Sequence, residues 1–510
     1  LPISNTVLVP VNLTVTDNNG DTPTLPVLDI SSSENGIVEL PDWVNPLFRD
    51  AFSRYTHIPV NNGDVIPILI QDDLTEKQIN HVRKILESHL TSIFGSEWGN
   101  DKTAVRDSIA MSNAILFLLN DEDEYDNPNL EALMNADVVG QDLLATEIFP
   151  ESSPEYIMSS ERDASYEEIL HFIHGFGIQS AFPNYQDSLL VAMENAISNN
   201  IYNPLWDIPQ EHYDEEYLAM GLECYFGLWS HDPNENGYCG DNEYAFITRE
   251  EMENGDPKLF ELVKGFFGET LEYEAEWGVS AGLDFLLHRE ESLDYTHRSQ
   301  YLKNARLIGD NTINLLGNNF DNLLVGNDGV NRLAGYGGHD VLIGQIGNND
   351  IAKFQGEPSE YTVVEMDDAD GHDDYFITDL ISNRDSTCHI IDIHLLNFNG
   401  IVYEIENLLD VKNQLILPTE TKLLPAYPNP FNPVTTIRYH LAQNDWAQLT
   451  IIDLLGRPVR TLLQQQKTAG KYSIKWDGKN DVGQPMSAGM YFYQLQTQYM
   501  TETQKIILIK

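Results

Sequence analysis

One short stretch combines carboxylates and imidazoles at helical spacing: Tyr166-Glu167-Glu168-Ile169-Leu170-His171-Phe172-Ile173-His174-Gly175. With Glu167 at zero on a helical wheel, His171 lies at about 40°, His174 at about −20° and Glu168 at about 100°. These side chains therefore share one face of a helix. Imidazole nitrogens and carboxylate oxygens are ligands that Zn²⁺ accepts. The stretch predicts a metal site on this helix.

The spacing also suggests what such a metal would do. E-E-x-x-H from Glu167 has the spacing of the H-E-x-x-H zinc helix, with a carboxylate at the first ligand position. Glu168 stands where that motif has its general base. A hydrolytic zinc site has three protein ligands and leaves one position for water, so a third ligand must come from elsewhere.

The stretch Glu215-Glu216-Tyr217-Leu218-Ala219-Met220-Gly221-Leu222 resembles the glutamate helix that follows the zinc helix in metallopeptidases of the anthrax-lethal-factor group. The resemblance covers residues 55–268 and implies that Glu216 is the third zinc ligand. It also implies that Tyr213 donates to an oxyanion. Gln141-Asp142-Leu143-Leu144 would be the edge strand along which such enzymes lay a protein substrate.

The carboxylate at Glu167 leaves alternatives open. A site of two glutamates and one histidine is richer in oxygen than most zinc sites, so His174 could replace Glu167 as a ligand. Catalysis could have been lost, or His171 and His174 could be ordinary core or surface histidines. A di-iron bundle is disfavoured because it needs a second Glu-x-x-His, which the sequence lacks.

A second candidate ion site lies in a nine-residue repeat, in which glycines recur at positions 317, 326, 335 and 344. The unit from Gly335, G-Y-G-G-H-D-V-L-I, resembles the GGxGxDxUx unit of the RTX parallel β-helix, which binds calcium. Glycine permits the sharp backbone turn and the approach of carbonyls to an ion, and aspartate supplies a charged ligand. The apolar eighth position is expected to fill the interior, and it is occupied by Leu324, Leu333, Leu342 and Ile351.

The aspartate position of the repeat is Asp only at Asp340 and is otherwise Asn322, Asn331 and Asn349. Fewer carboxylates predict one or two weak calcium sites around Asp340. The expected ligands are Gly335, Gly337, Gly338, Asp340, Asn331, Asn349 and Asp350.

The last segment, residues 424–510, reads as a small β-sandwich: extended segments separated by glycines, with Trp476 packed inward at a turn. It contains P-N-P-F-N-P-V-T from Pro428, D-L-L-G-R from Asp453 and W-D-G-K-N from Trp476. These boxes resemble the type A sorting domain of the type IX secretion system, a relative of the flagellar hook-capping Ig-like domain. The resemblance implies export by the type IX machinery to the outer surface of a Gram-negative-type bacterium. An adhesive Ig-like domain without a sorting role is the alternative.

Composition excludes some partners. The chain has 29 basic and 80 acidic residues and a net charge of −51, which repels nucleic acid and anionic lipid surfaces and suits divalent cations. Three cysteines do not make a disulfide framework, although Cys224 and Cys239 would pair in an oxidising compartment. No apolar run reaches the roughly 18–20 residues of a transmembrane helix. Because the chain begins Leu1-Pro2-Ile3, we expect its true N-terminus upstream.

Helices are expected at 75–93, 165–178 and 214–229, and strands at 114–119 and 141–149. The predicted fold is multidomain, comprising the end of a cadherin-like β-sandwich (1–28), an α+β metallopeptidase-like domain (40–302), RTX repeats (303–356), a β-rich cap (357–415) and the Ig-like sorting domain (424–510). The sequence predicts a secreted or cell-surface protein with bound Ca²⁺ and Zn²⁺, or, alternatively, a non-catalytic calcium-stabilised adhesin or surface-layer protein.

Overall fold

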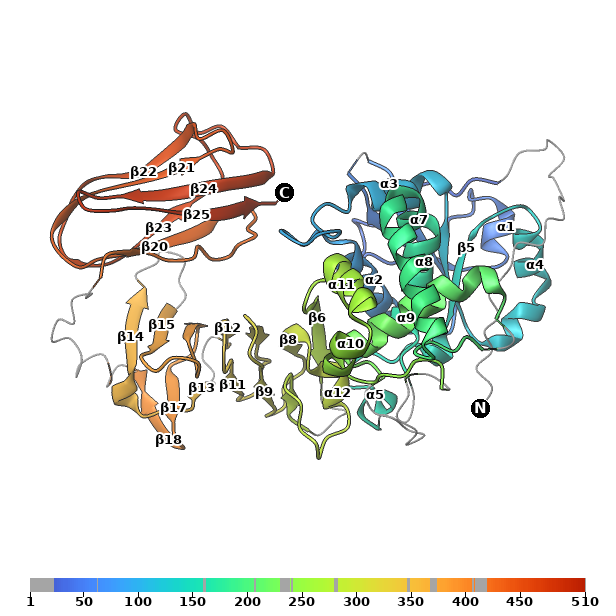
Figure 1. Cartoon of the computed structure of the whole chain (residues 1–510), viewed down its shortest axis with the longest axis horizontal. Coiled ribbons are helices and arrows are strands. Elements are labelled where there is room, and N and C mark those ends of the chain that lie inside the picture. The colour runs from blue at the N-terminus through green and yellow to red at the C-terminus, as the bar shows by residue number, and fades with distance from the viewer. Residues whose placement is uncertain are drawn as a thin grey trace. The chain divides into compact units, whose positions relative to one another are not determined.

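The computed structural model describes residues 23–509 except 62, 159–161, 206–207, 230–238, 240–241, 279–282, 346–348, 367–373, 406–407 and 409–419. The chain forms two compact units, Leu1–Glu406 and Asn407–Lys510 (Figure 1). Most of the expected end of a β-sandwich (1–28) lies outside the described residues, as does most of the C-terminal end of the expected cap. Among the helices that are described, none is both long and apolar enough to cross a bilayer.

The first unit begins with a five-stranded sheet in the order β1-β2-β3-β4-β5. Its strands are β1 (Val38–Glu39), β2 (Arg54–Pro59), β3 (Val65–Ile70), β4 (Ile115–Leu119) and β5 (Gly140–Leu144). The first three are antiparallel, and β3, β4 and β5 are parallel. Every residue of the apolar run β4 is buried. β5 is an edge strand of this sheet, as expected for the segment from Gln141. It ends at Leu144, however, and the chain turns into the 3₁₀ helix Ala145–Glu147 instead of continuing as a strand to residue 149.

The helices of this unit are α1 (Pro46–Arg49), α2 (Glu76–Leu90), α3 (Thr103–Ser112), α4 (Pro128–Met134), α5 (Pro154–Met158), α6 (Ser165–Ile173), α7 (Gln179–Ala181), α8 (Pro183–Ser198), α9 (Tyr213–Phe226), α10 (Arg249–Gly255), α11 (Pro257–Phe267) and α12 (Thr296–Ser299). α2, α6 and α9 match the expected helices. α2 starts at a capping box, because the Thr75 and Gln78 side chains each bond the other's backbone N–H.

The chain continues from α6 through a π-helical turn, His174–Ile178, into α7. This turn packs closely on α3: a Cβ at Gly177 would lie 2.7 Å from Val105 Cγ1. Glycine at this position therefore lets the two segments approach. The widened turn at His174 follows directly on the part of α6 that carries the candidate ligands.

A buried ion network ties α2 to the segment before α6. His81 Nε2 lies 2.7 Å from Asp163 Oδ2, and His81 Nδ1 lies 3.4 Å from Glu151 Oε2. Tyr273 OH donates to Glu151 Oε1 at 2.5 Å. Burial disfavours the imidazolium, but the two carboxylates outweigh it and raise the pKa of His81 to about 10. The network thus holds a charged histidine in the core.

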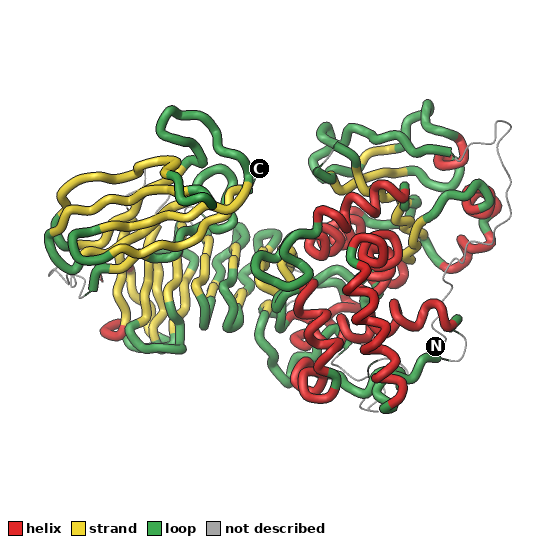
Figure 2. Tube along the Cα trace, turned by 45° about the horizontal axis from the view of Figure 1, so that its top comes forward, coloured by secondary structure: helices red, strands yellow, loops and turns green. Residues whose placement is uncertain are grey.

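After α11, successive strands from β6 to β13 alternate between two sheets (Figure 2), whereas β14, β15 and β16 follow one another in one sheet and β17 and β18 in the other. The inner strands of each sheet are parallel. One sheet has the order β14-β15-β16-β12-β10-β8-β6 and the other β18-β17-β13-β11-β9-β7. The strands are β6 (Leu271–Trp277), β7 (Phe285–Leu286), β8 (Leu302–Leu307), β9 (Asn314–Leu316), β10 (Leu323–Val325), β11 (Arg332–Ala334), β12 (His339–Ile343), β13 (Ile351–Phe354), β14 (Tyr361–Met366), β15 (Asp374–Asp379), β16 (Thr387–Ile391), β17 (Leu395–Phe398) and β18 (Ile401–Glu404).

The nine-residue spacing of the repeat correctly predicts which side chains fill the interior of this two-sheet segment, except in its last turn. Leu324, Leu333 and Leu342 are fully buried, and Leu324 pairs with Leu342, eighteen residues on. Leu333, however, pairs with Ala352, so this part of the chain contains one residue more than the nine-residue repeat predicts. Ala352 rather than the expected Ile351 is fully buried, and Ile351 is half-buried.

The second unit is a sandwich of two antiparallel sheets. Its strands are β19 (Lys422–Leu423), β20 (Thr435–Leu441) and β23 (Gly470–Trp476) in one sheet, and β21 (Asp445–Ile452), β22 (Pro458–Lys467), β24 (Gly489–Gln496) and β25 (Thr501–Leu508) in the other. Trp476 is fully buried, with its ring centroid 5.2 Å from that of Phe431 and 5.3 Å from that of Tyr491. The inward packing expected for Trp476 is confirmed.

Candidate metal centre

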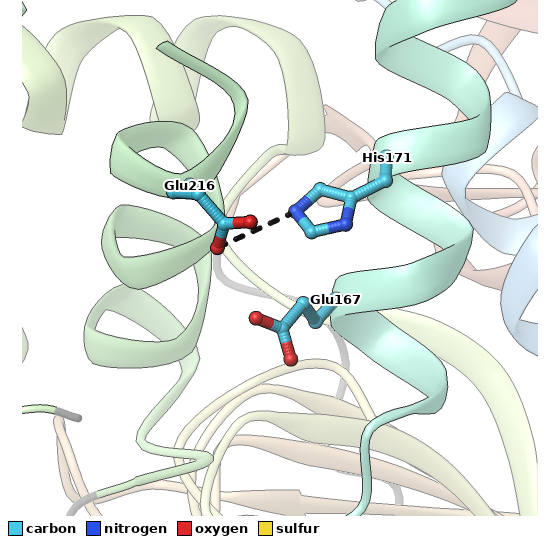
Figure 3. A group of neighbouring side chains, drawn as sticks. All are labelled: Glu167, His171 and Glu216. Carbon is cyan, nitrogen blue, oxygen red and sulfur yellow. Dashed lines mark ion pairs between the residues drawn. The ribbon is translucent and has the colours of Figure 1, made fainter. Parts of the chain in front are cut away.

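Three side chains from two helices converge in the core of the first unit. Glu167 and His171 lie one turn apart on α6, and Glu216 lies on α9. One potential ligand atom from each residue lies within 4.8 Å of the others. Their exposed fractions are 4%, 6% and 3%, respectively. Figure 3 shows the imidazole of His171 reaching from α6 toward the carboxylate of Glu216.

The helices that carry these residues are held by close packing. All but one residue of α6 is buried, as is most of α9. A Cβ at Gly221 of α9 would lie 2.6 Å from Leu259 Cδ2 of α11, so glycine lets these helices approach. Glu167, His171 and Glu216 are therefore buried between closely packed helices, where a charge is expensive without a partner.

His171 has a nitrogen without a hydrogen bond. Among the described residues, buried Nε2 has no hydrogen-bond partner, and the nearest carboxylate oxygen of Glu216 is 3.9 Å away. Nδ1 lies 3.6 Å from Glu168 Oε2. Burial opposes protonation, but the carboxylates of Glu216 and Glu168 outweigh it and raise the pKa of His171 well above its usual range.

Glu168 lies at the side of this group and is 22% exposed at its side chain. Gln141 Nε2, on the edge strand β5, donates to Glu168 Oε2 at 2.7 Å. Burial, which exceeds the opposing effect of His171, raises the pKa of Glu168 to about 7. A carboxylate with this pKa can both take up and release a proton near neutral pH.

The spacing of the motif did not predict a cation beside Glu167. Arg162 Nη2 donates to Glu167 Oε2, and Arg162 Nη1 lies 3.1 Å from both carboxylate oxygens of Glu223. Its guanidinium also stacks 5.1 Å from the ring of Trp229. Glu223 follows Glu216 by two helical turns, so its place on the same face of α9 was readable from the sequence. Arg162 precedes α6 and has no such signal.

His174 and Tyr213 lie outside the converging group. His174 Nε2 lies 2.7 Å from Gln186 Oε1, and Gln186 in turn donates to Asp214 at 2.5 Å. Burial lowers the pKa of His174. His174 therefore contacts polar residues other than Glu167, His171 and Glu216. Tyr213 is half-buried and begins α9 one turn before Glu216.

The expected calcium ligands lie in the two-sheet segment, Asp340 within β12 and the others in the connections between strands. Asp340 is 2% exposed; its Oδ1 accepts from Asn322 N at 3.0 Å, and its Oδ2 has no hydrogen bond within the described part of the chain. Burial raises the pKa of Asp340 to about 9. A Cβ at Gly335 would lie 2.0 Å from Asp340 Oδ2, which requires glycine there. Gly337 approaches Asn319 Oδ1, and Gly338 has a left-handed φ of 96°.

The neighbouring positions are already hydrogen-bonded to the backbone. Asn331 Oδ1 accepts from Asn327 N at 2.8 Å, and Asn331 Nδ2 donates to Ile313 O at 2.9 Å. Asp350 accepts from Asn331 N at 2.7 Å and from Gln345 N at 2.9 Å. Because of the extra residue in the frame, buried Asp350 takes the place expected for Asn349, which is exposed.

The cysteines are unpaired in the structure. Cys224, Cys239 and Cys388 are all buried free thiols. Burial raises the pKa of all three well above its usual value. They are therefore poor nucleophiles and poor metal ligands in this state.

Comparison with known proteins assigns a family to one segment. Residues 434–501 match the FlgD Ig-like domain, which agrees with the antiparallel sandwich of the second unit. No curated protein matches the chain.

Solved structures give partial likenesses. Latent PorU from Porphyromonas gingivalis is 18% identical over 27% of this chain and 12% of PorU, with a TM-score of 0.16. FlgD from P. aeruginosa is 22% identical over 16% of this chain and 67% of FlgD, with a TM-score of 0.13. PorZ, a surface component of the type IX secretion system of P. gingivalis, is 16% identical over 31% of this chain and 25% of PorZ, with a TM-score of 0.15. The chain thus spans an eighth of PorU and a quarter of PorZ.

Proposed function

We propose that the first unit holds a divalent metal, zinc in the first instance, between Glu167, His171 and Glu216, and hydrolyses peptide bonds there. The observation that carries the proposal is the buried His171 Nε2, which lacks a hydrogen bond among the described residues and faces two carboxylates. A buried nitrogen without a partner is costly, and a metal ion is a partner that fits this donor set.

Charge supports the same reading. Arg162 pairs with both Glu167 and Glu223, which are buried, and the buried carboxyl of Glu216 lies 3.9 Å from His171 Nε2. A divalent cation would offset the remaining negative charge. Arg162 would then serve to orient Glu167, as polar groups behind metal ligands commonly do.

The residues around the centre suit hydrolysis. Bound zinc polarises a carbonyl and lowers the pKa of water. Glu168 would accept the proton of the attacking water and pass it to the leaving amine, while Gln141 holds its carboxylate in place. Tyr213 would donate to the developing oxyanion. An extended peptide would add to the edge of β5, where backbone groups can pair with it.

The remaining parts would deliver and stabilise the protein. We assign the second unit to export by the type IX machinery, because the P-N-P-F-N-P box occurs on a fold that matches the FlgD Ig-like domain. The turn at Asp340 would bind one calcium ion outside the cell through Asp340 Oδ2 and nearby backbone carbonyls. The carboxylate and amide of Asp350 and Asn331 are already used, which favours a single site.

The contact between Arg162 and Glu167 favours a second candidate, a non-catalytic surface protein. In that case the arginine alone would balance the glutamates, and the two-sheet segment would carry binding. Zinc analysis of the purified full chain after dialysis separates the two. About one zinc per chain supports the enzyme; no zinc in the wild type, at concentrations where known zinc hydrolases are filled, supports the surface protein.

A further inference from the structure

Buried asparagine side chains join successive turns of the two-sheet segment. Asn322 Nδ2 donates to Lys303 O at 3.1 Å, nineteen residues earlier in the chain. Asn331 Nδ2 donates to Ile313 O at 2.9 Å, eighteen residues earlier. Their exposed fractions are 2% and 0%, respectively. The same bond, from a side-chain amide to a backbone carbonyl of the preceding turn, therefore occurs in two turns.

The oxygen of each amide is used within its own turn. Asn322 Oδ1 accepts from Asn318 N at 2.9 Å, and Asn331 Oδ1 accepts from Asn327 N at 2.8 Å. Asn322 Nδ2 also donates to Asn318 Oδ1 at 3.0 Å. A carboxylate in place of either amide would keep the acceptor and lose the donor. It could reach the carbonyl of the preceding turn only through a cation, which carboxylate and carbonyl oxygens both bind.

Asp340 shows what the carboxylate does at the same place in a later turn. Its Oδ1 accepts from Asn322 N at 3.0 Å, and its buried Oδ2 has no hydrogen-bond partner among the described residues. In both amide bonds, the acceptor carbonyl lies one residue before the strand partner of the residue that follows the asparagine. Val341 pairs with Leu323, so the corresponding carbonyl for Asp340 is Asn322 O. Two acceptors then correspond where the other turns have a donor and an acceptor.

We propose that the amides of Asn322 and Asn331 take the place of calcium ions, so that their turns fold without calcium and only the turn of Asp340 responds to it. This inference goes beyond the single ion proposed at Asp340 and rests on the proposed role of calcium in this segment. Each amide makes permanently, within the chain, the link between turns that an ion makes only when calcium is present. Replacing either asparagine by aspartate should therefore convert a fixed link into a calcium site.

The test compares three variants of the full chain. Asn322→Asp and Asn331→Asp each exchange the amide nitrogen for an oxygen of similar size, and Asn319→Asp adds the same charge at an exposed position nearby. In calorimetry without calcium, the Tm of the first two should fall by about 2 to 5 °C, because a buried donor is lost and an unpaired charge is added. Millimolar calcium should restore at least half of this loss, in addition to the wild-type response. Asn319→Asp should match the wild type under both conditions.

The number of bound ions gives a second measurement. Equilibrium dialysis should find one more calcium ion per chain in Asn322→Asp and in Asn331→Asp than in the wild type. An unchanged calcium-free Tm in these variants overturns the inference, because the amides would then not link the turns. A fall in Tm without added calcium binding also overturns it, as does a variant that folds neither with nor without calcium. A wild type without a calcium response, beside variants that gain one, overturns only the site proposed at Asp340.

Discussion

Replacing His171 by Asn is expected to abolish the response of the first unit to zinc. The change removes one of three donors and loses no hydrogen bond at Nε2. We expect Kd to rise at least about 100-fold, since even residues behind metal ligands change affinity 10- to 100-fold. At zinc concentrations 100 times the wild-type Kd, binding stabilises the folded state by about 2.7 kcal/mol, and the variant gains only about 0.4 kcal/mol.

These free energies correspond to a measurable shift in Tm. A unit of 406 residues has an unfolding entropy of about 0.85 kcal/mol/K. Zinc should therefore raise the Tm of the wild type by about 3 °C and that of the variant by about 0.5 °C. Differential scanning calorimetry of the full chain, with and without zinc, measures both.

The chain supplies a matched control three residues away. His174→Asn loses the 2.7 Å contact with Gln186, so its metal-free Tm should fall by 1 to 2 °C, about 1 kcal/mol, while the zinc response persists. Equal zinc responses in the wild type and His171→Asn would refute the site. A loss of the zinc response in His174→Asn but not in His171→Asn would also refute the site, because His174 rather than His171 would then be the ligand.

Four further predictions address separate parts of the chain. Glu168→Gln should keep the zinc affinity and reduce hydrolysis of an unstructured protein substrate about 10²- to 10⁴-fold; an unchanged rate would remove its role as base. Asp340→Asn copies the residue that other turns use, so it should raise the calcium-free Tm and remove the calcium-dependent rise, seen by calorimetry with and without calcium. Because the pKa of His81 is raised to about 10 in the folded state, protonated His81 stabilises the fold fully below pH 6.5, and this stabilisation is lost as the pH rises toward 10. The Tm of the wild type should therefore fall between about pH 6.5 and 10, and the Tm of His81→Gln should change less over the same range. Trp476→Ala should destabilise only the second unit, by about 3–5 kcal/mol, leaving the transition of the first in place.

The helical part of the candidate site could be read from the sequence because it depends on local geometry. Spacing alone puts Glu167 and His171 on one face, and α6 has that face buried. Glu216 came from resemblance, since no local rule says which two helices meet. Arg162 was missed because it precedes the helix, where residue spacing carries no directional information.

In the nine-residue repeat, residue spacing predicted most of the interior positions and failed at the last one. Nine-residue spacing predicted the buried Leu324, Leu333 and Leu342, because each turn reuses the same inward position. It failed at Ile351, where one additional residue shifts the frame and buries Ala352. An insertion inside a turn leaves the glycine spacing intact and is therefore invisible in that spacing. Which residue faces inward is decided by the pairing of the strands, and only the fold defines this pairing.

The glutamate at position 167 and the arginine at position 162 are best understood together. A neutral imidazole at the first ligand position needs no counter-charge, whereas a carboxylate there adds a negative charge to a core that already holds Glu216 and Glu223. Arg162 contacts Glu167 and Glu223 at once, so it returns the local balance to that of a site with a histidine. The substitution therefore does not by itself mark a lost site, because the chain carries the compensation that a glutamate ligand would require.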